Sequence, residues 1–117
     1  MNINIDDVWS MLKGICSLEE SAKDENIIYC AIALNEFSAI LKEKFSEKAV
    51  IACGLLAYYY YCLLGGQENI GDVAFEAGDV SVKLDSSKTN VADLKKLAYE
   101  YARDDIKRDI DFTFKAV

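Results

Sequence analysis

The chain has 117 residues, 52% hydrophobic and 28% charged, which is enough apolar material for one domain with its own core and argues against disorder. Its net charge of −7 argues against a surface for a phosphate backbone or an anionic membrane, since both need clustered lysine and arginine. Histidine is absent, which removes the commonest general base and the commonest metal ligand.

The first half of the chain predicts two amphipathic helices. Asn4 or Asp6 can cap the first, and apolar residues recur behind them at three- and four-residue spacing. The second is predicted over 25–44, with Ser21 or Asp24 as its cap. Its apolar stripe is Ile27, Ala31, Leu34, Ser38 and Leu41, widened by Ile28, Ile32, Phe37, Ile40 and Phe45. A stripe this wide predicts packing on two neighbours. The first ten residues lack a basic region and an apolar run, so we expect no signal peptide.

The segment 49–64 is the one around which we expect the chain to fold. It reads AVIACGLLAYYYYCLL, is apolar except at Gly54, and ends in two glycines. Its length favours a helix over a strand, and a helix that is apolar all round is buried. A membrane span needs about 20 apolar residues, which this segment does not have. We therefore predict a central helix wrapped by the rest of the chain or by other subunits.

Four consecutive tyrosines, at 58–61, step around this helix by about 100° each, so one flat contact cannot bury them all. Each hydroxyl must also reach water or a hydrogen-bond partner. Two interpretations stay open. The rings are core aromatics with their hydroxyls at the rim, or Tyr59 and Tyr60 lie at a subunit interface, where tyrosine is enriched.

The remainder predicts a β-hairpin, a last helix and a terminal arm. Alternating apolar residues at 73–84, with Gly78 at the turn, predict a hairpin that must lie on the helices or pair with another subunit. Asn90 and Asp93 form a capping-box pattern at the start of a helix predicted over 91–109. The tail 111–117 is predicted to add a strand or an interface arm. The fold class is thus mainly α, a single domain over 1–117 with about four helices.

The residues that carry chemistry are sparse. The four cysteines are Cys16, Cys30, Cys53 and Cys62, and no two of them form a CxxC pair. Cys53 and Cys62 fall on opposite faces of the central helix, more than about 13 Å apart along its axis, so they cannot bridge. We expect buried, reduced thiols in a cytosolic compartment. The glycine-containing turns match no phosphate-binding loop.

The densest carboxylate group is Asp104, Asp105, Asp109 and Asp111. In a continuous helix Asp105 and Asp109 share a face and can bind a divalent cation, but basic residues at the same spacings make a hydrated, salt-bridged face the simpler interpretation. We predict no catalytic residue, no cofactor and no metal; an enzyme using this cluster with a metal is the weakest hypothesis.

The order of parts resembles a known family. A helical pair leads to the Ala/Tyr-rich helix at 57–61, a hairpin of the form F-x-A-G-D-V-S-V at 75–82, a charged helix and a D-F-x-F tail at 111–114. This pattern is similar to the head–tail connector (neck, head-completion) proteins of tailed phages and prophages of Gram-positive bacteria. The similarity covers most of the chain, through short motifs.

The resemblance implies a structural virion protein, present in the virion or the bacterial host cytoplasm. Such proteins form a ring that docks on the portal, extends the DNA channel and meets neighbouring neck or tail-completion proteins. It implies a homo-oligomer without sequence-specific nucleic-acid binding or membrane association. The residues that we expect at subunit interfaces are Tyr59, Tyr60, Phe75, Val80, Val82, Phe112 and Phe114. The competing hypothesis is a small cytosolic helical adaptor or regulator, a monomer or dimer, that binds one partner through an apolar groove.

Overall fold

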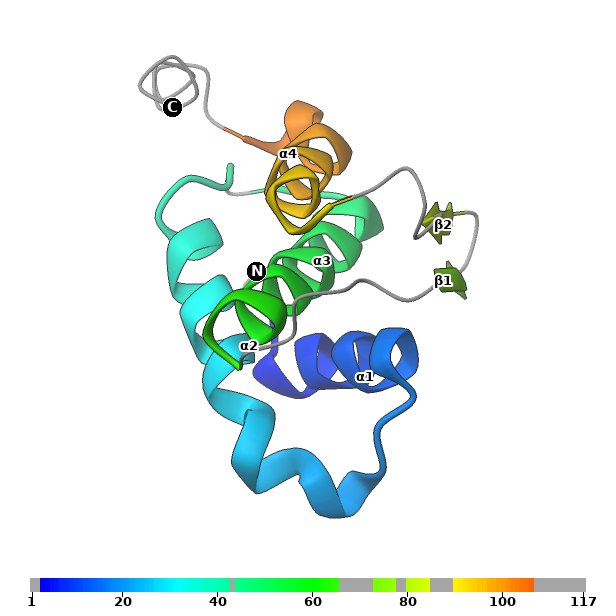
Figure 1. Ribbon diagram of the computed structural model, residues 1–117. Coiled ribbons are helices and arrows are strands. Elements are labelled where there is room, and N and C mark those ends of the chain that lie inside the picture. The colour runs from blue at the N-terminus through cyan, green and yellow to red at the C-terminus, as the bar shows by residue number, and fades with distance from the viewer. Residues whose placement is uncertain (1–2, 43, 66–72, 78–79, 85–89, 107–117) are drawn as a thin grey trace.

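The computed structural model describes residues 3–42, 44–65, 73–77, 80–84 and 90–106; the side chains of the 73–84 region are described only at Lys83. These residues contain four α-helices, two short 3₁₀ helices and two strands. The longest helix, α3 (Glu47–Leu64), runs through the middle, with α1 and α4 on either side of it, α2 on one flank and the strands on the other (Figure 1). The prediction of a mainly helical bundle around segment 49–64 is confirmed.

Helix α1 (Ile5–Cys16) begins where the sequence predicted. The Asn4 side chain accepts a hydrogen bond from the Asp6 backbone N–H at 2.9 Å, so Asn4 is the N-cap. The helix buries one face against the other helices through Val8, Trp9, Leu12 and Ile15. Glu20, in the 3₁₀ helix η1 (Glu20–Ala22), accepts hydrogen bonds from the Trp9 indole at 3.1 Å and the Lys13 ammonium at 2.8 Å. These contacts fix the connector against α1.

Helix α2 (Lys23–Ser38) differs from its prediction in three ways. Neither Ser21 nor Asp24 caps it, because η1 leads into its first turn without a break. It ends at Ser38, six residues before the predicted end, because Leu41 forms an antiparallel bridge with Ile106. The buried residues of this helix are Cys30, Ala33 and Phe37. The predicted stripe is partly right, since Phe37 and Leu41 are buried and Ile27, Leu34, Ile40 and Phe45 pack against the core, and partly wrong, since Ile28, Ala31 and Ser38 are exposed. Apolar residues surround this helix, so its own periodicity does not select the face that meets α3.

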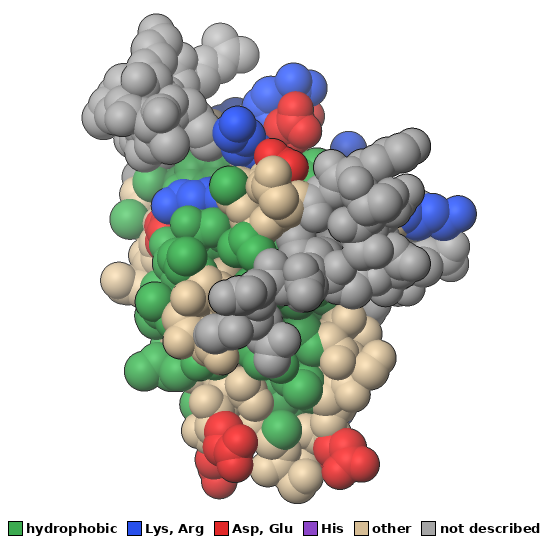
Figure 2. Space-filling model, viewed as in Figure 1, with side chains coloured by type: hydrophobic (Ala, Val, Ile, Leu, Met, Phe, Trp, Pro, Cys, Tyr) green, Lys and Arg blue, Asp and Glu red, His purple; other side chains and the backbone are tan. Residues whose placement is uncertain are grey.

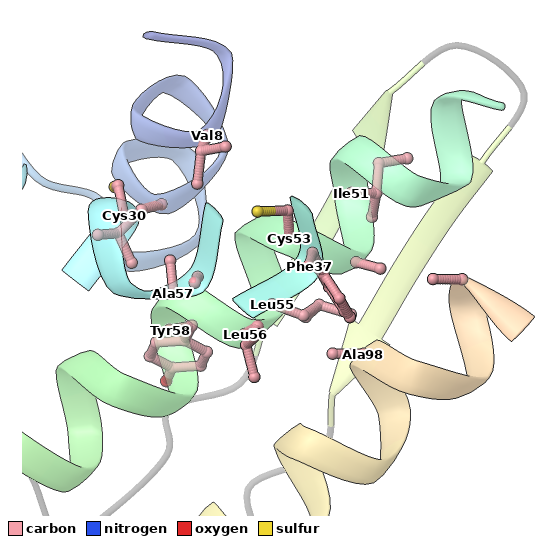
Figure 3. Packing of buried hydrophobic residues seen from close by; sticks show 14 of the residues in the cluster. Val8, Cys30, Phe37, Ile51, Cys53, Leu55, Leu56, Ala57, Tyr58 and Ala98 are labelled. Carbon is pink, nitrogen blue, oxygen red and sulfur yellow. The ribbon is translucent and has the colours of Figure 1, made fainter. Parts of the chain in front are cut away.

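Helix α3 is the core of the molecule. Every side chain from Ile51 to Ala57 is buried, and so are Tyr58 and Cys62. Figure 3 shows Phe37 of α2 beside Leu55 of α3. Gly54 permits a close approach of α1 to α3, because a Cβ placed there would lie 2.5 Å from the Cβ of Met11 on α1.

The segment predicted as a hairpin contains two antiparallel strands, β1 (Val73–Ala77) and β2 (Val80–Leu84). Their register places Phe75 opposite Val82 and Ala77 opposite Val80. Residues 78–79, where the turn was predicted, lie outside the described residues. Strand β1 lies against α1, on the flank of α3 away from α2 (Figure 1).

Helix α4 (Val91–Tyr101) starts with the predicted capping box, in which Asn90 and Asp93 each accept a hydrogen bond from the other's backbone N–H. It ends eight residues before the predicted end and is followed by the 3₁₀ helix η2 (Arg103–Asp105). Ile106 is extended, with φ −97° and ψ 141°, so the helix that would have placed Asp105 and Asp109 on one face has already ended. The predicted arm, 111–117, lies outside the described residues.

Candidate functional site

A half-buried polar cluster joins three helices on the side where α2, α3 and α4 meet. Glu36 of α2 accepts a hydrogen bond from the Tyr60 hydroxyl of α3 through one carboxylate oxygen and from the Tyr99 hydroxyl of α4, at 2.5 Å, through the other. The Lys95 ammonium lies 3.8 Å from Glu36 and 5.7 Å from the centre of the Tyr59 ring. We call these five residues the Glu36 cluster.

The environment of the Glu36 cluster favours the neutral form of two of its tyrosines, Tyr60 and Tyr99. Burial raises the pKa of Tyr60 and of Tyr99, and the hydrogen bond that each hydroxyl donates to Glu36 raises it further. Both carboxylate oxygens are engaged by hydroxyl donors from within the chain. The chemistry of the cluster is therefore that of a brace that ties α2 to α3 and α4.

A second polar contact fixes the start of the central helix. Ser46, the N-cap of α3, donates its backbone N–H to one Asp105 oxygen at 3.2 Å and its hydroxyl to the other at 2.8 Å. Lys42 reaches the same turn, donating its backbone N–H to the Asp105 carbonyl at 2.7 Å and its ammonium to the Asp104 carbonyl at 2.8 Å. Asp105 is only 8% exposed. Its carboxylate is thus committed to a structural contact, which the prediction of a solvated helix face missed.

An open cleft of about 380 Å³ lies beside this contact, at the end of α4. Its lining combines two cations, two acids, one aliphatic and one aromatic side chain, namely Lys48, Arg103, Glu100, Asp104, Leu97 and Tyr101. The charges balance, so the cleft has no preference for one sign of ligand. In the described part of the chain, no three His, Cys, Asp or Glu side chains are grouped to hold a metal ion.

The thiols are free and mostly inaccessible. Cys30, Cys53 and Cys62 are buried and Cys16 is half-buried. Burial raises the pKa of Cys16 and of Cys53 to about 12 and that of Cys30 to about 11. Since the thiolate is the nucleophile, these cysteines are poor candidates for covalent chemistry near neutral pH.

The structure brings together two of the predicted interface residues, Tyr59 and Tyr60, whose rings lie 5.0 Å apart in the Glu36 cluster. Both are half-buried, and the use of their outer surface in an interface stays a prediction. Phe75, Val80 and Val82 lie on the paired strands, on the other flank of α3, and Phe112 and Phe114 lie outside the described residues. Sequence reasoning missed Glu36 and Tyr99 because they are 63 residues apart.

Among the side chains that the structure describes, the exposed large hydrophobic ones are Ile28, Leu63 and Leu64, with 57%, 52% and 58% of their surface accessible. None of these was a predicted interface residue, although the uncharged run 26–35 in α2 and the apolar end of α3 were visible signals. Hydrophobic side chains also gather on the side of the molecule where α2 lies (Figure 2).

Comparisons with protein-family models, with curated proteins and with solved structures found no match to this chain. Among the described residues, no helix has the length and hydropathy needed to cross a bilayer.

Proposed function

We propose that this chain is a structural virion subunit, a head–tail connector that docks on the portal of a tailed phage or prophage as a ring and extends the DNA channel. The proposal rests on the resemblance in the order of parts, from the Ala/Tyr-rich helix through the F-x-A-G-D-V-S-V segment to the D-F-x-F tail. A helical body with a two-stranded element on one flank supports that resemblance.

The observation that carries the proposal is the pair of strands β1 and β2. Among the described residues no third strand joins them, so both outer edges present backbone N–H and C=O groups without a ladder partner. An isolated two-stranded sheet is marginally stable, and an open edge is a template for pairing with another chain. In subunits that assemble side by side, such an open strand edge can pair with the neighbouring chain.

The charge of the chain is consistent with this function. A net charge of −7 on each subunit disfavours adhesion of DNA to a ring through which the duplex must slide. The polar groups of the two main contacts, the Glu36 cluster and the Asp105–Ser46 contact, are engaged within the fold. Together these features favour a structural role over a catalytic one.

The experiment that tests the proposal is co-sedimentation with portal-bearing heads from the same phage or prophage, combined with light scattering of the free protein. We expect the protein to pellet with heads that carry the portal and to stay in the supernatant with heads that lack it. A stable monomer or dimer that pellets with neither kind of head would refute the connector function.

A charge reversal on the strands sharpens this test. Lys83 is exposed on β2, and Lys96 is exposed on the outer surface of α4. We expect Lys83→Glu to reduce co-sedimentation and Lys96→Glu, which changes the net charge equally, to leave it unchanged. Equal losses for both variants would indicate that only the overall charge matters.

A second candidate function is a small adaptor that binds one partner protein, favoured by the exposed Ile28, Leu63 and Leu64. This hypothesis predicts a monomer or dimer that ignores portal-bearing heads, so the same experiment separates the two functions.

A further inference from the structure

The solvent-facing side of α2 is unusual in a chain that is 28% charged. Ten consecutive residues, 26–35, carry no charge. Ile28, Ala31, Asn35 and Ser38 are all exposed, and their spacing of three or four residues places them on one face of the helix. We call these four residues the α2 outer face. These four positions lack the charged side chains that normally keep a surface helix in water, whereas the first turn of α2 carries the exposed acids Asp24 and Glu25.

The end of α3 extends this surface. The Tyr29 ring of α2 meets the Tyr61 ring of α3 edge to face at 5.9 Å, and the Tyr29 hydroxyl lies beside Gly65. The last turn of α3, with the exposed Leu63 and Leu64, therefore lies beside the turn of α2 that carries Ile28. A helix face that exposes Ile28 and lies next to the exposed Leu63 and Leu64 is typical of a protein contact.

Charge limits what can cover this surface. Two copies of a chain with a net charge of −7 repel each other wherever their acidic surfaces meet. The α2 outer face itself carries no acid, and the exposed acids of α2, Asp24 and Glu25, are confined to its first turn. A second copy that meets residues 28–38 therefore avoids most of that repulsion. On the other flank of α3, the described side chain of the strands is the exposed cation Lys83.

The position of the two flanks favours a head-to-tail contact. Helix α2 and the strands lie on opposite sides of α3 (Figure 1). A ring needs two different, complementary surfaces on opposite sides of each subunit, whereas a two-fold dimer needs one surface that complements itself.

The size of the surface explains why such a contact would be weak alone. The whole of α2 has 16 residues, which span about 24 Å, so a strip about 10 Å wide along it has at most roughly 240 Å², and the α2 outer face is only part of that strip. A stable dimer buries about 800 Å² per partner. The contact therefore needs high concentration, or a closed ring in which every subunit makes it twice.

We infer that the α2 outer face, with Leu63 and Leu64, docks on the β1–β2 side of a second copy of this chain. This inference rests on the proposed function, because it names the contact between neighbouring subunits of the ring.

The test is disulfide cross-linking of the double variant Ala31→Cys/Lys83→Cys in two settings, as free protein at about 1 mM and bound to portal-bearing heads. At about 1 mM protein, a contact with a Kd of about 1 mM still forms. The native thiols are poor partners, because burial raises their pKa. We expect a ladder of dimers, trimers and larger species, whereas each single variant and the control Lys96→Cys/Lys83→Cys give no ladder. Dimers from Ala31→Cys alone would indicate a two-fold α2 contact and would overturn the inference, as would the absence of a ladder in both settings.

A second variant separates contact from folding. In the double-cysteine background, Ile28→Glu should reduce cross-linked species by about tenfold or more, because a buried unpaired charge is strongly unfavourable. Lys96→Gln changes the net charge equally and should keep the ladder, and both variants should keep the parent's circular dichroism. If the protein pellets with heads but shows no ladder there, the inferred contact is wrong and the connector function stands. If a ladder forms in solution but the protein does not bind heads, the inferred contact stands and the connector function is wrong.

Discussion

Replacing Glu36 tests whether the Glu36 cluster holds the helices together. Hydrogen bonds to a charged group contribute about 1.5–3 kcal/mol each, and Glu36→Ala removes the acceptor of both tyrosine hydroxyls. The Tyr99 residue is 7% exposed, so water replaces the lost carboxylate poorly there, whereas the half-buried Tyr60 hydroxyl can turn to water. The partly exposed Lys95 contact adds little. We expect Glu36→Ala to lower the free energy of unfolding by about 3 kcal/mol.

The assay is urea unfolding near neutral pH, followed by far-UV circular dichroism and by the fluorescence of the single tryptophan, Trp9, which is buried in α1. Coincident transitions would establish that the whole bundle unfolds as one unit. Glu100→Ala removes an exposed acid from α4 and is the matched control; we expect a change within about 0.5 kcal/mol.

A double-mutant cycle decides between a specific contact and a general loss of charge. Tyr99→Phe should cost about 1.5 kcal/mol in the parent and much less in the Glu36→Ala background, where the acceptor is already gone. If Tyr99→Phe costs the same in both backgrounds, the hydroxyl and the carboxylate are not coupled and the reasoning is wrong.

Four further predictions concern stability. Gly54→Ala should lower the unfolding free energy by about 1–3 kcal/mol, because a Cβ there meets Met11 at 2.5 Å and the clash outweighs the higher helix propensity of alanine; chemical denaturation measures it, and a stabilised variant would contradict it. Asp105→Ala should cost about 2 kcal/mol, and combining it with Ser46→Ala should add only about 1 kcal/mol, because Ser46→Ala then removes no more than the N-cap bond from the Lys48 N–H; a larger added loss would argue against the Asp105–Ser46 contact. Ser17→Gly should raise stability by about 0.5–1 kcal/mol, since the residue that ends α1 has φ 56°, and an unchanged melting temperature would count against this strain. Burial favours the neutral thiols of Cys16 and Cys53, so their full contribution to the free energy of unfolding is present below the usual thiol pKa of 9. That contribution falls as the pH rises toward about 12, by up to about 1.4 kcal/mol per pH unit and thiol. A melting temperature that stays constant above pH 9 would refute this.

Several features follow from the sequence because their causes are local. The central helix is encoded by a continuous apolar run, and its burial follows from the lack of any polar face. Asn4 at the start of α1, and Asn90 with Asp93 at the start of α4, contact backbone groups within three residues, so neighbouring residues suffice to predict them. The strand segments likewise show their alternation directly.

Other features are decided only when distant segments meet. Helix α2 is apolar on several sides, and only the positions of α1 and α3 select Cys30, Ala33 and Phe37 as its buried face. Both α2 and α4 end early because Leu41 and Ile106 pair across 65 positions, which no local pattern encodes.

The same holds for the polar contacts. Asp105 was predicted to be a solvated acid, but Ser46, 59 residues away, donates two hydrogen bonds to it. No local pattern singled out Glu36, which the tyrosines of two other helices reach. Composition and periodicity thus determined which segments form helices and which helix is central. The tertiary structure decided where helices stop and which polar groups are used inside, because a hydrogen bond between remote residues depends on how the helices pack and leaves no periodic trace in either segment.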